Sequence, residues 1–512
     1  MQDDEAYTLV LRDPLPGADA LYTAAATRAF DRRAIERHGL PGIVLMRRAG
    51  AAAFEFLRDR WPDAEVLTIC CGRGNNAGDG YVVAGMALDR GLQVQLLQVG
   101  DAADLKGDAA RARDWALERG AQIEPFDAAA SLRGDIVVDA LLGTGIAGAV
   151  RPAFADAISA ITDSRRPVLA LDLPSGLDAD AGCVRGIAVC ADATITFIAA
   201  KRGLLTGAGP DHAGDLALAD LGVPYEVFEE GEADAATKLL RLGEIPCRLP
   251  RRSRTAHKGA FGHTLIVGGD HGFGGAAVLA AEAAVRAGAG LVSVATRGAH
   301  LAPLLARVPE AMAHAVDTRA EALALAEVAS VIVVGPGLGR APWGEQMLDA
   351  VLAADRPVVA DADALNLLAA SDRRLPEGSV ITPHPGEAAR LLGTSTQAVG
   401  VDRFDAVAAL AASAGAIAVL KGAGTLIAGR AEDGIALCPY GNPGMASGGM
   451  GDVLSGVVGA LLAQGMEARA AAALAACVHG AAGDLAALET GEPGLRASDL
   501  APHIGPLLAA AG

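Results

Sequence analysis

Short apolar runs alternating with segments of helical spacing constrain the fold of this chain more than any other feature. In the first part of the chain, the runs that read as strands are Val66–Cys70, Val94–Val99, Asp135–Gly143 and Val168–Gly176. The segments with helical spacing are Ile43–Trp61, Lys106–Arg119 and Phe154–Ile161. This order of elements predicts a parallel sheet with helices on both faces, and ligands off the carboxyl ends of its strands.

The alternation fades between about Asp220 and Arg254, where the sequence changes from acidic to basic, and it restarts at His263–Gly269. A long Ala-rich helix is expected at Ala276–Ala287, and two helices, Gly451–Leu462 and Ala468–Leu488, are expected to close the second block. We therefore predict two doubly wound α/β domains, residues 1–228 and 229–512, the first of them Rossmann-like.

Composition narrows the choice of partners. The 512 residues carry a formal charge of −18, which argues against a nucleic-acid or anionic-membrane surface. The one basic run, Arg251–Lys258, is either a solvated linker or faces a phosphate. A large acidic α/β chain is commonly an oligomer, so we expect a homo-oligomer whose partners are small molecules.

Location and redox state are read from the same composition. No run of eighteen apolar residues is free of polar interruption, so no membrane-spanning helix is expected. The acidic start lacks the layout of a secretory signal, and seven cysteines without CxxC spacing suggest free thiols in a reducing compartment. We expect a cytoplasmic protein.

The first candidate site is the glycine-rich segment Cys70–Gly85, CCGRGNNAGDGYVVAG, at the end of the first predicted strand. Glycines at 72, 74, 78 and 80 would let backbone N–H groups turn toward an anion, and the dipole of the following helix would add positive potential. Asn75, Asn76 and Asp79 add oxygen ligands. The segment predicts a phosphate-binding loop, with an ordinary tight turn as the alternative.

Two further strand ends bring polar groups to the same edge of the sheet: DALLGTGIAG, with Asp139, and DLPSGLDAD, with Asp172 and Ser175. Converging amide, carboxylate and hydroxyl oxygens can hold a hard cation beside a phosphate and leave one carboxylate for proton transfer.

The second domain contains the segment Asn442–Gln464, NPGMASGGMGDVLSGVVGALLAQ. Glycines at 448, 449 and 451 precede a helix whose first turn contains Asp452, so backbone amides and a carboxylate lie side by side, as phosphoryl transfer requires. A helix-capping role for Asp452 is the structural alternative. His384, between two prolines, and Lys258 could likewise be a turn residue and a solvated lysine.

The three polar segments of the first domain, in this order from about Ala24 to Leu221, resemble the epimerase domain of the NAD(P)H-hydrate repair family. The resemblance implies a potassium ion (K⁺) on Asn76, Asp139 and Ser175, with Asp172 handling the proton at C6. It also implies substrate contacts from Asn75, Asn76, Ala77, Gly78 and Asp79, from Gly143, Thr144, Gly145, Ile146, Ala147, Gly148 and Ala149, and from Asp172. Ala77 departs from the family, which usually has glycine there, and a positive φ at this position would be strained by its side chain.

The second domain resembles the ribokinase-like dehydratase of the same family. Its segments match in order: His257–Asp270, Val334–Arg340, Asp361–Leu368, Thr382–Leu392, Lys421–Thr425 and the glycine segment before Asp452. The resemblance implies that Ala276, Gly337, His384 and Asp452 contact the hydrated nicotinamide nucleotide. ADP or ATP, with Mg²⁺, is expected on Lys421, Gly422, Ala423, Gly424, Thr425 and Gly451. Met450 stands where the family commonly has threonine.

Together these resemblances imply a bifunctional enzyme, an isomerase joined to a carbon–oxygen lyase. The first domain would interconvert the R and S forms of hydrated NADH and NADPH, and the second would dehydrate the S form with hydrolysis of ADP or ATP. A small-molecule kinase of the hydroxymethylpyrimidine or thiazole type is the enzymatic alternative. A nucleotide-sensing N-terminal domain without catalytic activity is the alternative from a different class.

Overall fold

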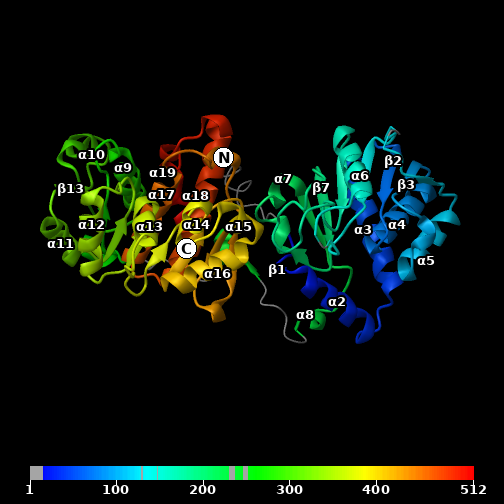
Figure 1. Ribbon diagram of the computed structural model, residues 1–512, viewed down its shortest axis with the longest axis horizontal. Helices are drawn as coiled ribbons and strands as arrows, with labels where there is room; N and C mark the ends of the chain where they lie inside the picture. Colours follow the sequence, from blue (N-terminus) through cyan, green and yellow to red (C-terminus); the bar gives the residue numbers. More distant parts are fainter. Residues whose placement is uncertain (1–14, 129–130, 147, 230–236, 246–251, 512) are drawn as a thin grey trace. The chain divides into compact units, whose positions relative to one another are not determined.

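The chain folds into two compact units, Pro14–Thr237 and a second that contains Lys238–Gly512. The computed structural model describes residues 15–128, 131–146, 148–229, 237–245 and 252–511. Much of the predicted junction, and Ala147 of the predicted substrate loop, lie outside the described residues. Figure 1 shows both units as sheets covered by helices, and both belong to the α/β class that the alternation predicts.

The N-terminal unit is built on a parallel sheet in the order β4-β3-β2-β5-β6-β7-β9. Its strands are β2 (Val66–Cys71), β3 (Gln93–Gln98), β4 (Ile123–Pro125), β5 (Ile136–Ala140), β6 (Val168–Leu171), β7 (Ala193–Phe197) and β9 (Asp215–Ala219). The chain runs outward from β2 to β4 and then returns to β5 on the other side of β2. The strand order therefore reverses between β2 and β5, the position where ligands bind in open sheets of this kind.

Helices cover both faces of this sheet, because successive residues of each strand enter opposite cores. Ile69 and Val138 pack in the cluster that contains α3 and α4, whereas Cys70 and Val137 pack with α6. The helices are α2 (Ala24–Glu36), α3 (Gly42–Arg60), α4 (Asn75–Asp89), α5 (Gly107–Leu117), α6 (Pro152–Asp163), α7 (Gly209–Ala213) and α8 (Glu226–Glu229). A short strand, β1 (Ala20–Tyr22), pairs in parallel with β8 (Ala200–Lys201) and places α2 beside the sheet.

The C-terminal unit repeats this plan with the strand order β13-β12-β11-β14-β15-β16-β17-β18-β19-β10. Its strands are β10 (Thr237–Leu239), β11 (His263–Val267), β12 (Leu291–Thr296), β13 (Met312–Ala315), β14 (Val331–Val334), β15 (Val358–Ala360), β16 (Val380–Ile381), β17 (Ile417–Leu420), β18 (Thr425–Ala428) and β19 (Ile435–Cys438). The order reverses between β11 and β14. Among the described strands of this unit, only β18 runs antiparallel to both of its neighbours, so Lys421–Gly424 is the turn of a hairpin.

Capping residues mark the starts and ends of helices in the C-terminal unit. A Thr318–Glu321 capping box starts α11, and Gly415 in the left-handed conformation ends α16. The helices are α9 (Gly274–Arg286), α10 (Leu301–Arg307), α11 (Arg319–Val328), α12 (Pro342–Ala353), α13 (Ala362–Ala369), α14 (Pro385–Leu391), α15 (Thr396–Val401), α16 (Arg403–Ala414), α17 (Met450–Ala463), α18 (Ala468–Thr490) and α19 (Ala501–Ala511).

Two expectations about the end of the chain need revision. The unit does not close with two helices, because α19 follows α18 and buries Ile504 and Leu507; its prolines at 502 and 506 masked the helical spacing. By length and composition α18 could also cross a membrane, which its interrupted apolar run did not suggest. However, 78% of its apolar window is buried inside the protein, as in a core helix.

Candidate active sites

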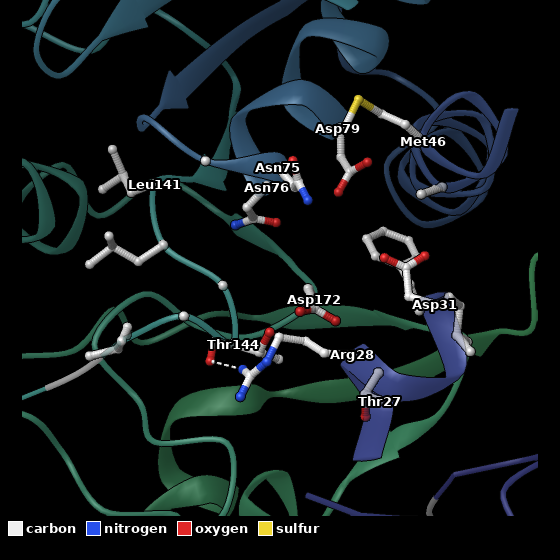
Figure 2. A pocket seen from close by; sticks show the side chains of 18 of the residues that line it. Thr27, Arg28, Asp31, Met46, Asn75, Asn76, Asp79, Leu141, Thr144 and Asp172 are labelled. Atoms are coloured by element: carbon white, nitrogen blue, oxygen red, sulfur yellow. Dashed lines mark hydrogen bonds between the residues drawn. The ribbon is translucent and has the colours of Figure 1, made fainter. Parts of the chain in front are cut away.

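The N-terminal unit has a pocket of about 840 Å³ at the carboxyl ends of β2, β5 and β6, where the strand order reverses. Figure 2 shows its side chains converging on one opening from several elements. Most of the residues predicted from the sequence line it: Asn75, Asn76, Asp79, Gly143, Thr144, Gly145, Ile146, Ala149 and Asp172. The three polar segments therefore do meet at one edge of the sheet, as expected for neighbouring parallel strands.

Other predicted residues of the same segments do not line this pocket. Ala77 is completely buried in the helix core, and its φ is not positive, so its methyl group causes no strain there. Gly78 faces α3, where a β-carbon would come within 2.5 Å of the Met46 sulfur. Gly148 is also absent from the lining. The Asn75–Asp79 segment is the first turn of α4, not a free loop.

Backbone freedom for binding an anion is the reason expected from the sequence for the glycines of this segment, and this explanation is wrong for two of them. Gly78 and Gly80 lie inside α4 with ordinary helical φ, and a β-carbon on Gly80 would approach that of Ala140 to 2.6 Å. Gly72 allows the carbonyl of Leu141 to approach, since a β-carbon would lie only 1.8 Å from it. These glycines serve close packing of α4 and the β5 loop, which in turn brings the polar residues together.

Asp139 and Ser175, two of the predicted cation ligands, do not line the pocket and are hydrogen-bonded to each other. The hydroxyl of Ser175 donates to Asp139 Oδ1 at 2.6 Å, and the Ser175 amide donates to Oδ2 at 2.8 Å. Both side chains are fully buried. Burial raises the pKa of Asp139 to about 6, although these hydrogen bonds favour its ionised form.

Asn76 supplies the observation that fits a cation at this place. Its side-chain amide is buried, and neither the nitrogen nor the oxygen has a hydrogen-bond partner among the described residues. A buried amide without partners costs free energy unless another group satisfies it. A hard cation bound by amide, carboxylate and hydroxyl oxygens would do so for the oxygen, so the residues present are compatible with a cation site.

Asp172 lies across the pocket and is held by a residue that the sequence interpretation missed. The amine of Lys201 donates to Asp172 Oδ1, to Thr196 Oγ1 (3.0 Å) and to the carbonyl of Phe197 (2.8 Å). Lys201 is only 1% exposed, and the backbone of Asp172 has a φ of +67°. A lysine inside the apolar run that follows β7 was the available signal, because a buried lysine requires a partner.

Two more carboxyl groups face the same space, Asp31 from α2 and Asp79 from α4 (Figure 2). Burial raises the pKa of both, and the charge of Asp172 raises each further, while Lys201 opposes this. The pocket thus combines an ion-paired carboxylate with two carboxyl groups whose pKa values are raised, a combination suited to proton transfer.

The C-terminal unit places Asp452 in the first turn of α17, next to the glycine segment. Gly448 is exposed with open space where a side chain would be, and Gly449 takes a left-handed φ of +94°. Space is therefore open at Gly448, whereas a β-carbon on Gly449 would lie 2.5 Å from the side chain of Leu279. Burial, followed by the charge of Asp361, raises the pKa of Asp452 to about 7, while Lys421 acts to lower it.

Lys421 and Asp361 form a buried ion pair beside Asp452. The Lys421 amine lies 2.7 Å from Asp361 Oδ1, and the hydroxyl of Ser455 donates to Oδ2 at 2.8 Å. Burial alone would lower the pKa of Lys421, but Asp361 and then Glu387 hold it above its usual value. A β-carbon on Gly451 would lie 3.1 Å from the lysine amine. Lys421, Gly451 and Asp452 are therefore close together, as the sequence predicts.

The predicted nucleotide segment Lys421–Thr425 is the β17–β18 turn, and a buried arginine that the sequence interpretation missed holds it. The guanidinium of Arg403 donates to the carbonyls of Leu420 (3.3 Å), Lys421 (3.4 Å) and Gly424 (3.3 Å). Arg403 is 4% exposed, and burial lowers its pKa to about 10. The available signal was an arginine at the start of a mainly apolar helix.

The predicted substrate contacts of this unit lie at neighbouring strand ends. Gly337 has a φ of +58°, and a β-carbon there would meet Ala276 at 3.2 Å. His384 caps α14: its Nδ1 accepts from the Gly386 amide at 3.0 Å, and its Nε2 lies 3.3 Å from Glu387 Oε1. The turn role is therefore present, while the side chain remains half exposed. In the basic run, Arg252 donates to the carbonyl of Gly288, and Lys258 is exposed.

Comparisons with known families agree with this division of the chain. The family described as NAD(P)H-hydrate dehydratase matches residues 264–505, and the family described as YjeF-related protein N-terminus matches residues 42–203. A ribokinase-like superfamily protein from Enterococcus faecalis, of known structure, is 29% identical with a TM-score of 0.50. The alignment covers 54% of this chain and 96% of that one. Fold and sites thus define a protein with a YjeF-related unit and a ribokinase-like unit.

Two full-length relatives extend the match to the whole chain. The bifunctional NAD(P)H-hydrate repair enzyme of Coxiella burnetii is 46% identical over 484 residues, covering 94% of this chain and 98% of that protein. The enzyme of the same description from Escherichia coli is 44% identical over 494 residues, covering 96% and 94%. The chain belongs to the family of bifunctional NAD(P)H-hydrate repair enzymes.

Proposed function

We propose that this chain returns hydrated NADH and NADPH to their normal forms in two steps. The N-terminal unit interconverts the R and S epimers at C6, and the C-terminal unit dehydrates the S epimer at the cost of ADP or ATP. Family membership supports the pairing of activities. The observation that carries the chemistry is the half-buried carboxylate of Asp452 beside an exposed glycine segment and the Lys421 amine.

The dehydration follows from this geometry as a phosphoryl transfer followed by an elimination. Asp452 accepts the proton of the C6 hydroxyl, whose oxygen then attacks the terminal phosphorus of the nucleotide. The bond from that phosphorus to the bridging oxygen breaks, and AMP leaves from ADP, or ADP from ATP. Backbone amides at the start of α17 and the Lys421 amine offset the charge on the transferred group. Electrons from the ring nitrogen then expel inorganic phosphate from C6, and loss of a proton from C5 restores the double bond.

The residues that would hold the two ligands are those brought to the strand ends of the C-terminal unit. We assign the nucleotide to Lys421, Gly422, Ala423, Gly424, Thr425 and Gly451, and the hydrated dinucleotide to Ala276, Gly337, His384 and Asp452. Mg²⁺, when bound with the nucleotide, would supply positive charge that offsets the charge of the transferred phosphoryl group. The exposed Gly448 and the hairpin turn, fixed by Arg403, support a docking place for the phosphates.

For epimerisation we assign proton transfer at C6 to Asp172. Its carboxylate lines the pocket, and its ion pair with Lys201 holds it in place. Dinucleotide contacts are assigned to Asn75, Asn76, Asp79, Gly143, Thr144, Gly145, Ile146 and Ala149, which line the same pocket. Ala77 and Gly78 support α4 by packing and are not assigned a contact.

Potassium is the ion that we propose for Asn76, Asp139 and Ser175. When bound, it would supply positive charge beside the substrate phosphate. The buried and unpartnered amide of Asn76 and the carboxylate of Asp139 supply ligand oxygens of the required kind. Asp139 and Ser175 are already oriented by their mutual hydrogen bonds.

The proposal is tested by incubating the full chain with a mixture of hydrated NADH epimers, ADP and Mg²⁺ while following the return of the NADH absorbance. Complete recovery of both epimers is expected. An Asp452→Asn variant should lose dehydration and keep epimerisation. A stable phosphorylated product in place of inorganic phosphate would decide for the small-molecule kinase. If the full chain dehydrates the S epimer but neither it nor a fragment of residues 1–230 interconverts the epimers, the N-terminal unit is non-catalytic.

A further inference from the structure

Helix α2 forms one wall of the N-terminal pocket, although it lies before the region that matches the family. The match begins at residue 42, whereas α2 spans Ala24–Glu36 and contributes Thr27, Arg28 and Asp31 to the lining. Figure 2 shows Arg28 reaching from α2 to Thr144, with which it forms a hydrogen bond. Residues outside the family motifs therefore help to shape the site.

Contacts at both ends of α2 hold it in this position. At its start, β1 pairs with β8 so that Tyr22 lies opposite Lys201, and the Ala24 amide donates to Asp180 at 2.6 Å. Farther along, Phe30 packs edge-on against Tyr22 and Phe228, each at 4.9 Å between ring centres. The register of α2 is thus tied to the strand that carries Lys201, the partner of Asp172.

The cationic groups of the pocket differ in how far they are neutralised. Lys201 is paired with Asp172, and Arg73 lies 2.6 Å from a carboxylate oxygen of Asp104. Arg28 donates only to the carbonyl of Thr144, at 3.0 Å, and within the described part of the chain no carboxylate lies within 4.0 Å of it. Arg151, at the far end of the same loop, has no such partner there either. Arg28 therefore offers a charge and unused donors to a ligand.

We propose that Arg28 binds the diphosphate of the hydrated dinucleotide and, through the carbonyl of Thr144, positions the Gly143–Thr144 segment beside Asp172. This inference rests on the proposed epimerase function. Arginine suits the role because its planar guanidinium can bond one phosphate with two N–H groups while a third holds the carbonyl.

The spacing of the two ends of the pocket favours the diphosphate over other phosphates. A β-carbon on Gly143 would lie 3.5 Å from Asp172 Oδ2, and the carbonyl of the next residue accepts from Arg28. Asp172, which acts on C6, lies beside Gly143, and the guanidinium of Arg28 lies beside Thr144, so the two groups are about one residue apart along this segment. In the dinucleotide a single ribose separates the nicotinamide ring from the diphosphate, whereas the 2′-phosphate of NADPH is on the other nucleoside.

The test compares Arg28→Gln with Arg32→Gln, a matched control on the same helix that is exposed but does not line the pocket. Epimerisation of hydrated NADH and hydrated NADPH is measured over a range of salt concentrations. Arg28→Gln should raise KM roughly 10- to 100-fold for both substrates, the loss expected for a charge-assisted hydrogen bond. It should also weaken the salt dependence of KM, while Arg28→Lys retains part of both effects.

Each other outcome is informative. A loss restricted to hydrated NADPH would place the 2′-phosphate at Arg28 and overturn the assignment to the diphosphate. A fall in kcat with unchanged KM and salt dependence would leave Arg28 with the loop contact alone and would also overturn it. If the unaltered chain epimerises but Arg28→Gln matches Arg32→Gln, the inference is wrong and the proposed function stands. If the unaltered chain does not epimerise, the proposed function itself fails.

Discussion

The amine of Lys421 donates a 2.7 Å hydrogen bond to Asp361, a residue 60 positions earlier in the chain. Ser455 of α17 donates to the other oxygen of the same carboxylate at 2.8 Å, which ties the hairpin turn and β15 to the helix that carries Asp452. The ion pair therefore does two things at once. It fixes a lysine for the phosphates, and it determines the electrostatic surroundings of the proposed base.

The first prediction concerns the pH dependence of dehydration. Burial and Asp361 raise the pKa of Asp452 to about 7, so the carboxyl group is mostly protonated below that pH and cannot accept a proton. We expect kcat/KM for dehydration to rise as pH increases through about 7 and to fall close to tenfold per pH unit at lower pH. Initial rates from pH 5 to 8.5 would check this; a flat profile would contradict the role of Asp452.

The second prediction concerns a variant that should shift the acid side of this pH–rate profile. Asp361→Asn removes a negative charge beside Asp452 but leaves Lys421, so the pKa of Asp452 should fall and the acid limb of the rate profile should shift to lower pH. Ser455→Ala, which removes only a hydrogen bond to Asp361, is the control and should leave the limb nearly in place. The Asn variant should also lose about 3 kcal/mol of unfolding free energy in urea, because Lys421 loses its partner.

The third prediction tests the ion pair of the N-terminal pocket. Lys201→Met removes the charge that opposes protonation of the carboxyl groups around it, and Asp172 then loses its partner. Epimerisation should fall by roughly 100-fold or more, the size of a general acid–base contribution, while dehydration of the S epimer is unchanged. Lys106→Met, an exposed lysine of the same unit, is the control. Equal epimerisation by both variants would rule out a catalytic need for the pair.

The fourth prediction concerns potassium and uses stability as its readout. If K⁺ binds the folded N-terminal unit through Asn76, Asp139 and Ser175, replacing sodium with potassium at constant ionic strength should stabilise it by about 1 to 3 kcal/mol at saturating concentration. An Asn76→Ala variant should show no difference between the two salts. Thermal unfolding of the chain without substrate measures this directly, and an equal Tm in both salts for the unaltered chain would remove the ion from the account.

Residues that follow predicted strands could be placed from the sequence, because parallel strands necessarily bring their carboxyl ends to one edge. This is why Asp139, Asp172 and Lys421 were found, whereas Asp452 was found from the glycines that precede its helix. The same reasoning gave a wrong cause for Gly78 and Gly80, because glycines for close packing and glycines for backbone freedom look alike in sequence. The helix α19 was missed for a related reason, since its prolines hide an apolar face that tertiary packing preserves.

Residues whose importance comes from distant contacts could not be placed in this way. Lys201 stands out in the sequence only as a lysine within an apolar run, and its partner Asp172 lies 29 positions earlier. Arg28 is on a helix with no motif, and its partner Thr144 lies 116 positions later. Neither pairing can be read from a local sequence pattern, because the two partners of each pair lie far apart in the chain and on different elements. Identifying them requires the packed structure.

The last prediction concerns Arg403, which holds the β17–β18 turn from behind. Its buried guanidinium donates to the carbonyls of Leu420, Lys421 and Gly424, so replacing it with methionine leaves three acceptors, two of them in buried hydrogen bonds, without that donor. We expect a loss of about 2 to 4 kcal/mol in stability and a rise of at least about tenfold in KM for ADP, since a loosened turn binds phosphate poorly. KM for the hydrated dinucleotide should change less, and epimerisation should not change. Arg430→Met, at the exposed far end of the same hairpin, is the control. If Arg403→Met altered both KM values equally, the arginine would support the whole unit and not the nucleotide turn.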